Sequence, residues 1–116
     1  MTVEELVRQF RDAAIEKATA PVAKDQALHA EMSKAWRQLH ALGPKGQEAF
    51  KALLRDNSRH VRAWVAAQLL WLGDQSGVGV LQADAELDDI DGFGSSMVLK
   101  EWKAGRLGPP LGSLDA

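Results

Sequence analysis

The sequence predicts an all-α protein of five or six helices, and three observations support this. Apolar residues recur at steps of three and four along most of the 116-residue chain, which places them on one side of a helix. The stretches between these segments carry proline, glycine or side chains that cap a helix. No segment combines sustained apolar–polar alternation with β-branched residues, so no sheet is expected.

The first two helices are expected at about residues 2–18 and 25–42. Thr2 and Glu5 have the spacing of a capping box, which satisfies the free amides at a helix start. Pro21 then interrupts the helical hydrogen bonds, and the turn GPKG ends the second helix. Each helix is expected to carry one apolar stripe, formed by Val3, Leu6, Phe10, Ala13 and Ala14 in the first and by Leu28, Met32, Ala35, Leu39 and Leu42 in the second.

The fourth helix is expected in the stretch HVRAWVAAQLLWLGD, residues 60–74, which has almost no polar side. Between Val61 and Leu72 only Arg62 and Gln68 are polar. A helix that is apolar round most of its circumference must be enclosed by neighbouring elements. The segment is too short to cross a bilayer, which needs about 20 apolar residues. The sequence therefore predicts that this helix lies at the centre of the molecule.

Three shorter helices complete the expected set: about Gln47 to Arg55, about Val78 to Leu87, and one that is capped by Ser95 or Ser96 and ends at Gly105. Gly77 and Gly79 weaken the start of the second of these, since glycine costs about 1 kcal/mol against alanine inside a helix. Residues 1–107 are expected to form one helical domain. Residues 108–116, rich in glycine and proline, are expected to form a flexible C-terminal tail.

Composition narrows the class of protein. Hydrophobic residues make up 46% of the chain and charged residues 26%, which are ordinary values for a folded domain. The chain has no cysteine and a net charge of -2, so neither a thiolate site nor a general attraction to nucleic acid or anionic membrane is expected. The N-terminus lacks the pattern of a signal peptide. A soluble cytoplasmic protein without a membrane partner, metal or cofactor is expected.

Residues 49–74 carry a set of spaced residues that is typical of a known repeat. These residues are Leu53, Leu54, Asp56, Val61, Arg62, Ala66, Ala67, Leu69, Leu72, Gly73 and Asp74. With them the segment resembles a HEAT repeat. The chain as a whole resembles short bacterial HEAT-like proteins of uncharacterised function, which end in a helix with a pattern similar to that of Met97, Leu99, Gly105 and Leu107.

The resemblance implies a HEAT-like αα-superhelix, a fragment of a right-handed α-solenoid built from antiparallel helices. In such an arrangement a middle repeat packs against both of its neighbours, which would account for the apolar fourth helix. The resemblance also implies structural roles for Asp56, Val61, Arg62, Ala66, Leu69, Leu72 and Gly73. Asp56 would hold the turn between two helices, and Arg62 would pair with it or with a neighbouring repeat.

A strong charge cluster lies in the segment ADAELDDIDG. It consists of Asp84, Glu86, Asp88, Asp89 and Asp91. A calcium loop is not indicated, because Leu87 and Val98 occupy the first and last ligand positions. Two interpretations remain, a solvated end of a helix or an acidic patch that attracts a basic protein. Two interpretations also remain for Trp71: it is part of the core, or it stays partly exposed and anchors a partner.

A basic turn offers an alternative binding site. Arg55, Arg59, His60 and Arg62 lie close together in the sequence and could contact phosphates. The net acidic charge of the chain disfavours nucleic acid as a partner. None of the three histidines, which include His29 and His40, occurs in a metal-binding pattern.

These observations predict a non-catalytic protein–protein interaction module, either a monomer or a weak homodimer. The resemblance suggests one concrete form, a bacterial immunity-type inhibitor of a cognate toxin, and a basic toxin domain would suit the acidic cluster. The alternative is a nucleic-acid-binding helical repeat that uses Arg55 and Arg59.

Overall fold

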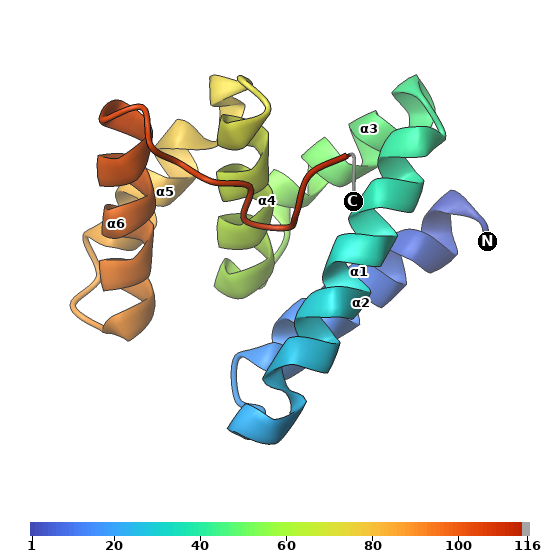
Figure 1. The fold of residues 1–116 in the computed structure, drawn as a ribbon, viewed down its shortest axis with the longest axis horizontal. Helices are drawn as coiled ribbons and strands as arrows, with labels where there is room; N and C mark the ends of the chain where they lie inside the picture. The colour runs from blue at the N-terminus through green and yellow to red at the C-terminus, as the bar shows by residue number, and fades with distance from the viewer. Residues whose placement is uncertain (115–116) are drawn as a thin grey trace. The chain divides into compact units, whose positions relative to one another are not determined.

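The computed structural model describes residues 1–114, and the regular secondary structure of this part of the chain consists of helices, with no strand (Figure 1). Its elements are α1 (Val3–Lys17), α2 (Val22–Ala41), α3 (Pro44–Ala52), the 3-10 turn η1 (Leu53–Arg55), α4 (Arg59–Trp71), the 3-10 turn η2 (Gln75–Gly77), α5 (Val78–Ala85) and α6 (Ile90–Lys103). The prediction of an all-α fold with five or six helices is confirmed. The superhelical arrangement stays a prediction. Each helix among these residues is too short or too polar to cross a bilayer.

The chain divides into two compact units. Of the described residues, unit 1 contains 1–53 and 111–114, and unit 2 contains Leu54–Pro110. The expected single domain at 1–107 stays a prediction. Residues 108–114 contain no helix, and Leu111 within them is fully buried. The last two residues of the expected tail, 115–116, lie outside the described residues.

Unit 1 is built from α1, α2 and α3, which pack on one another. The predicted capping box is present: the amide of Glu5 donates to Thr2 Oγ1 and the amide of Thr2 donates to Glu5 Oε1, each at 3.1 Å. The aromatic centre of the core joins all three helices. Phe10 meets Phe50 edge to face with ring centroids 5.3 Å apart, and Trp36 packs on Phe50 at 6.5 Å.

Two helices of unit 1 begin earlier than predicted, and a proline is the reason in each case. The second helix is expected from Asp25 but starts at Val22. Pro21 is its N-cap residue, so the loop between the first two helices is shorter than expected. The third helix was expected from Gln47 but starts with Pro44 at its first position. Proline fits there, because the first helical amide has no partner in any case and the fixed φ suits a helix.

Unit 2 is built round α4, which packs against η2, α5 and α6. Its centre is a cluster of four buried residues, Ala66, Leu70, Leu81 and Leu99. Seven residues of α4 are buried: Val61, Val65, Ala66, Ala67, Gln68, Leu69 and Leu70. Gln68, one of the two polar residues between Val61 and Leu72, is fully buried, whereas Trp64 and Trp71 are only half-buried.

The start of α5 lies unusually close to α4. A Cβ atom added to Gly77 would come within 2.6 Å of the Ala66 Cβ, so only glycine lets the two segments approach this far. Gly77 lies in η2 and allows η2 to pack closely on α4, whereas the sequence analysis expected it only to weaken the start of the fifth helix.

The end of α5 and the start of α6 also differ from the prediction. The fifth helix ends at Ala85, short of the expected Leu87. The sixth begins at Ile90, five positions before the expected cap at Ser95, because the Asp89 carboxylate accepts the amide of Gly92 at 2.7 Å and caps the helix there. The segment DGFG is thus the first turn of α6 and not a loop.

Candidate functional site

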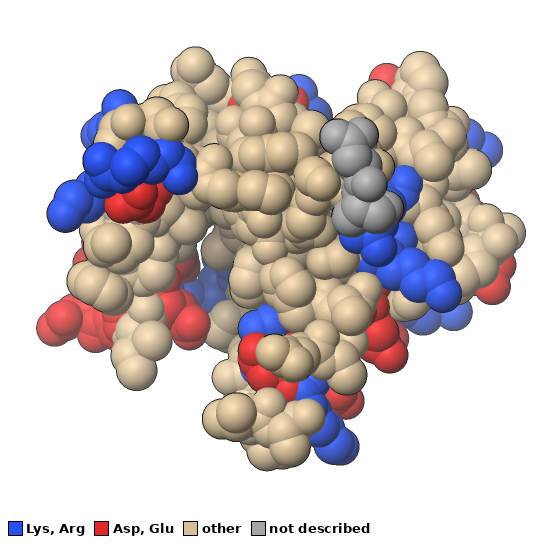
Figure 2. Space-filling view, viewed as in Figure 1, with Lys and Arg blue, Asp and Glu red and all other residues tan. Residues whose placement is uncertain are grey.

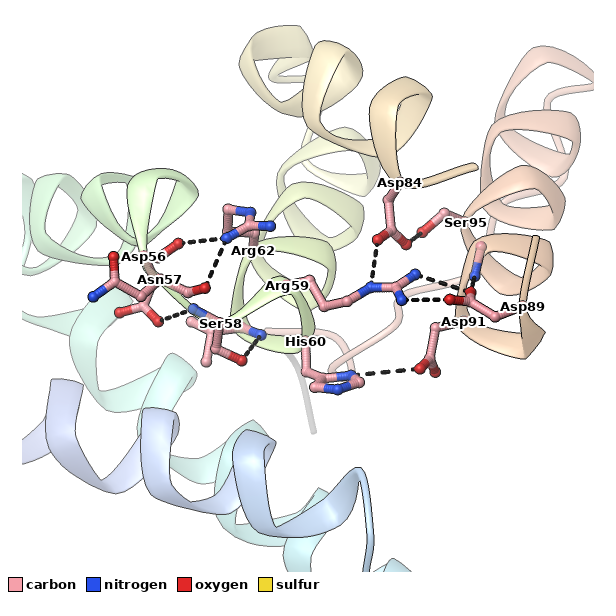
Figure 3. A network of polar contacts seen from close by, with 12 residues as sticks. Asp56, Asn57, Ser58, Arg59, His60, Arg62, Asp84, Asp89, Asp91 and Ser95 are labelled. Atoms are coloured by element: carbon pink, nitrogen blue, oxygen red, sulfur yellow. Dashed lines mark hydrogen bonds and ion pairs between the residues drawn. The ribbon is translucent and has the colours of Figure 1, made fainter. Parts of the chain in front are cut away.

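The predicted acidic cluster and the predicted basic turn meet at one guanidinium group in unit 2 (Figure 3). Arg59, at the start of α4, donates from Nε to Asp84 at 2.8 Å. Its two terminal nitrogens donate to the two oxygens of Asp89, at 2.6 and 3.0 Å. These partners are 25 and 30 positions away in the sequence, so no local pattern indicated the pairing.

Asp84 is the buried end of this arrangement. It projects from α5, is only 8% exposed, and accepts a second hydrogen bond from the Ser95 hydroxyl of α6 at 2.6 Å. A buried carboxylate is tolerated when it is paired and its oxygens have donors. Arg59, Asp84 and Ser95 therefore connect α4, α5 and α6, and the role of Asp84 is to hold these three helices together.

Asp89 is the exposed end, and it combines two functions. Its carboxylate binds Arg59 and also caps α6. The hydrogen bonds with Arg59, followed by the bond from the Gly92 amide, lower the pKa of Asp89 to about 2. The same contacts with Asp89 and then Asp84 raise the pKa of Arg59. Near neutral pH Asp89 is therefore charged and Arg59 cannot give up a proton.

His60 and Asp91 form a looser pair beside Arg59. The Nδ1 atom of His60 lies 3.8 Å from an Asp91 oxygen, which is too far for a hydrogen bond but close enough for an ion pair when the imidazole is protonated (Figure 3). Both side chains are partly exposed. The pair lies where α4 and α6 begin.

The remaining acidic residues share an exposed segment with large apolar side chains. This segment, residues 86–93, is called the acidic tip below. Glu86, Asp88 and Asp91 are exposed on it. Leu87 is 49% exposed, Ile90 87% and Phe93 67%. Figure 2 shows acidic residues gathered round uncharged ones at the end of unit 2 that holds the α5–α6 connection.

Sequence reasoning identified the acids of the tip but missed its apolar residues. The three large side chains fall within seven positions among the carboxylates, and that proximity was the available signal. The sequence DGFG is typical of a turn, so the sequence alone does not place Phe93 on a helix. Once Asp89 caps α6, Ile90 and Phe93 are three positions apart in its first turn.

An apolar groove in unit 2 adjoins the acidic tip. Its volume is about 330 Å³. Its walls come from α4, α5 and α6 and from Pro110; the lining residues are Arg59, His60, Ala63, Trp64, Ala67, Leu81, Asp84, Ile90, Asp91, Gly94, Ser95, Val98 and Pro110. Ile90 and Asp91 belong to both the groove and the tip, so the two features form one continuous surface.

The charged and hydroxyl groups of the groove lie in two sets, one joined by hydrogen bonds and the other at ion-pair distance. Arg59, Asp84 and Ser95 form one set and His60 and Asp91 another. Among the described residues, every buried side-chain nitrogen or oxygen has a hydrogen-bond partner. The groove therefore offers a ligand apolar surface inside and exposed carboxylates outside.

The repeat residues support the turn before α4. The Asp56 carboxylate accepts the amide of Ser58 at 3.0 Å and so holds the turn. Arg62 does reach Asp56, but it donates to the backbone carbonyls of Asp56 and Asn57, at 2.7 and 3.0 Å, and not to a carboxylate (Figure 3).

The other repeat positions lie in or directly after α4. Val61, Ala66 and Leu69 are buried, whereas Leu72 is 37% exposed. Gly73, with φ of 90°, ends the helix in a left-handed conformation that glycine adopts without strain.

Two expected binding residues lie apart from the groove. Trp71 is half-buried at the last position of α4 and does not line it, so its role as a partner anchor stays a prediction. Arg55 is exposed in η1. Of the two arginines predicted to contact nucleic acid, Arg59 is bound by two carboxylates, so Arg55 is the one that could still do so.

Within residues 1–114, no group of three or more histidine, aspartate or glutamate side chains is arranged to hold a metal ion. Comparison with protein-family models, with curated proteins and with solved structures finds no match to this chain.

Proposed function

We propose that this protein is a non-catalytic binding module that contacts another protein through the acidic tip and the adjoining groove of unit 2. The observation that carries the proposal is the exposure of Leu87, Ile90 and Phe93 beside one another at the tip. Isolated exposed apolar residues are ordinary, but a group that continues into an apolar groove is typical of an interaction surface.

The charged residues of the site favour binding over catalysis. A general acid or base needs a pKa near the working pH and a free path to its substrate. Asp89 is held charged by Arg59, and Asp84 is bound on both sides by Arg59 and Ser95. Their hydrogen bonds serve the packing of the helices, which leaves the surface to act through shape and charge.

The nucleic-acid alternative receives less support from this geometry. Arg59 forms ion pairs with two carboxylates, so it is not available to a phosphate group. Glu86, Asp88 and Asp91 are exposed nearby and would repel a phosphate backbone. Arg55 alone is weak evidence for a nucleic-acid-binding surface. A basic protein partner, such as the toxin domain of an immunity-type pair, is the form of the proposal that suits these charges, and a HEAT-like superhelix would be its scaffold.

Site-specific photo-crosslinking in the cells that produce the protein tests the proposal. A photoreactive phenylalanine analogue at Phe93 should give a discrete heavier species that contains a second protein. The same analogue at Val22, which is 92% exposed in unit 1, is the control and should give none. An absence of crosslinks at Phe93, or identical products at both positions, would contradict the proposal.

A further inference from the structure

We infer that the groove receives an apolar side chain from a basic segment of the partner protein, and that lysine or arginine residues of this segment lie against Glu86, Asp88 and Asp91. The inference rests on the proposed function and makes it more specific, since it names the chemistry of the partner. It joins three observations: the apolar interior, the paired polar groups and the unbalanced negative charge at the mouth.

The interior of the groove is suited to an apolar group. Small residues on facing helices create the space, with Ala63 and Ala67 on α4 and Gly94 on α6. A Cβ atom added to Gly94 would meet no heavy atom within 4 Å, so the wall is open at this point. A polar ligand group would find few unpaired partners inside, because Arg59 and Asp84 are bound to each other.

The charge at the mouth selects a basic segment. Arg59 offsets part of the charge of Asp84 and Asp89, and His60 approaches Asp91. Exposed carboxylates remain on the tip and attract lysine and arginine side chains at close range. Because Ile90 and Asp91 line the groove, an apolar residue inside it would bring its neighbours in the segment close to these carboxylates.

A second copy of the chain fits the same surface poorly. In a symmetric dimer through the tip, each residue would face the same region of the other copy. Glu86, Asp88 and Asp91 would then meet carboxylates, which is unfavourable near neutral pH. A small molecule is also a weaker candidate. The groove lies at the lower end of the roughly 300–1,000 Å³ typical of such sites, and the exposed Ile90 and Phe93 extend the apolar surface beyond it.

A displayed library of random peptides, selected on the purified full-length protein, provides the probe. The expected result is enrichment of sequences that place a large apolar residue next to lysine or arginine. Their affinity should fall as salt is raised, because exposed charge pairs are screened. Enrichment of acidic or uncharged sequences, or no enrichment, would overturn the inference.

A pair of glycine variants locates the binding on the structure. Gly94→Leu would fill the groove, and Gly79→Leu is its control: Gly79 also lies in a helix, a Cβ there also meets nothing within 4 Å, and it does not line this groove. Leucine is the better helix former, so both variants should remain folded, which circular dichroism and thermal melting would verify. Gly94→Leu should lower the affinity of the protein for the selected peptide by about tenfold or more, and Gly79→Leu should leave this affinity unchanged.

The outcomes separate this inference from the proposed function. Crosslinks at Phe93 together with full peptide affinity in Gly94→Leu would overturn the groove assignment and leave the proposed function standing. Loss of the Phe93 crosslinks would overturn both. If the protein associates with itself and Gly94→Leu abolishes this association, the inference of a basic segment is overturned and the occupant of the groove is a second copy of the chain.

Discussion

Arg59 joins two parts of unit 2, because it binds one carboxylate from α5 and another at the start of α6. Asp84 belongs to α5 and Asp89 precedes α6. A guanidinium group can satisfy both, since its five N–H groups point in fixed directions within one plane. The pairing turns a basic turn and an acidic cluster, which look like separate binding sites in the sequence, into one support for the ends of three helices.

The Asp89→Asn variant tests this support through its dependence on pH. Asparagine still caps a helix, but it cannot offer Arg59 a charge. The pKa of Asp89 is lowered from 3.8 to about 2 in the folded protein, so the carboxylate stabilises the fold at pH values above 3.8 and loses this effect as the pH falls through 2. At neutral pH the variant should unfold at lower urea concentration than the wild type.

The difference in urea midpoint between the two proteins should shrink as the pH falls below 3.8 and become small only below pH 2, where the Asp89 carboxyl is protonated in the folded protein as well. Glu101→Gln is a matched control. Glu101 pairs with Arg106 within five positions at the exposed end of α6, so its removal should change the midpoint little. A difference between Asp89→Asn and the wild type that stays constant with pH would contradict this role of the Asp89–Arg59 pair.

At this scale the sequence predicted which residues are charged but not which are paired. Asp84, Asp89 and Arg59 were all singled out, and Asp84 proved to be buried. Hydrogen bonds between residues 25 or 30 positions apart depend on how helices pack, which residue spacing does not encode. The local Thr2–Glu5 capping box, in contrast, was predicted in full because its geometry depends on four consecutive residues.

At the scale of the element, the ends of helices were harder to predict than their existence. Pro21, Pro44 and Asp89 each start a helix where the sequence suggested a loop. Proline occurs both after the end of a helix and at the start of the next, so its position alone does not show where the next helix begins. In a run of acidic residues each aspartate could be the N-cap, so the sequence does not show which one is. The early start of α6 adds Ile90 and Phe93 to its exposed first turn.

Two neighbouring glycines give opposite predictions about the packing of α5. Gly77→Ala should lower the free energy of unfolding by about 1–3 kcal/mol, because the new methyl group would press on Ala66. Gly79→Ala should raise it by about 0.5–1 kcal/mol, since its Cβ is unobstructed and alanine favours the helix. Urea denaturation of the two variants measures both values. Equal stability of Gly77→Ala and the wild type would show that η2 does not lie so close to α4.

At the scale of the whole chain, the surface charge is distributed with a clear bias. The net charge is only -2, yet four carboxylates fall within residues 86–91, beside three exposed apolar residues. Net charge alone therefore gives little information about the partner. The sequence predicted the helical class and an acidic surface, but not the groove, because a groove is formed by the spacing of α4, α5 and α6.

The measurement that tests the central claim most directly compares Ile90→Lys with Val22→Lys in binding to the peptide selected on the wild-type protein. Both residues are the first of a helix and both are highly exposed, at 87% and 92%, but only Ile90 belongs to the tip and the groove. Ile90→Lys should weaken binding by about tenfold or more, because it removes apolar contact and repels a basic segment, while Val22→Lys should leave it unchanged. Equal affinity of both variants and the wild type would contradict the assignment of the binding surface to unit 2.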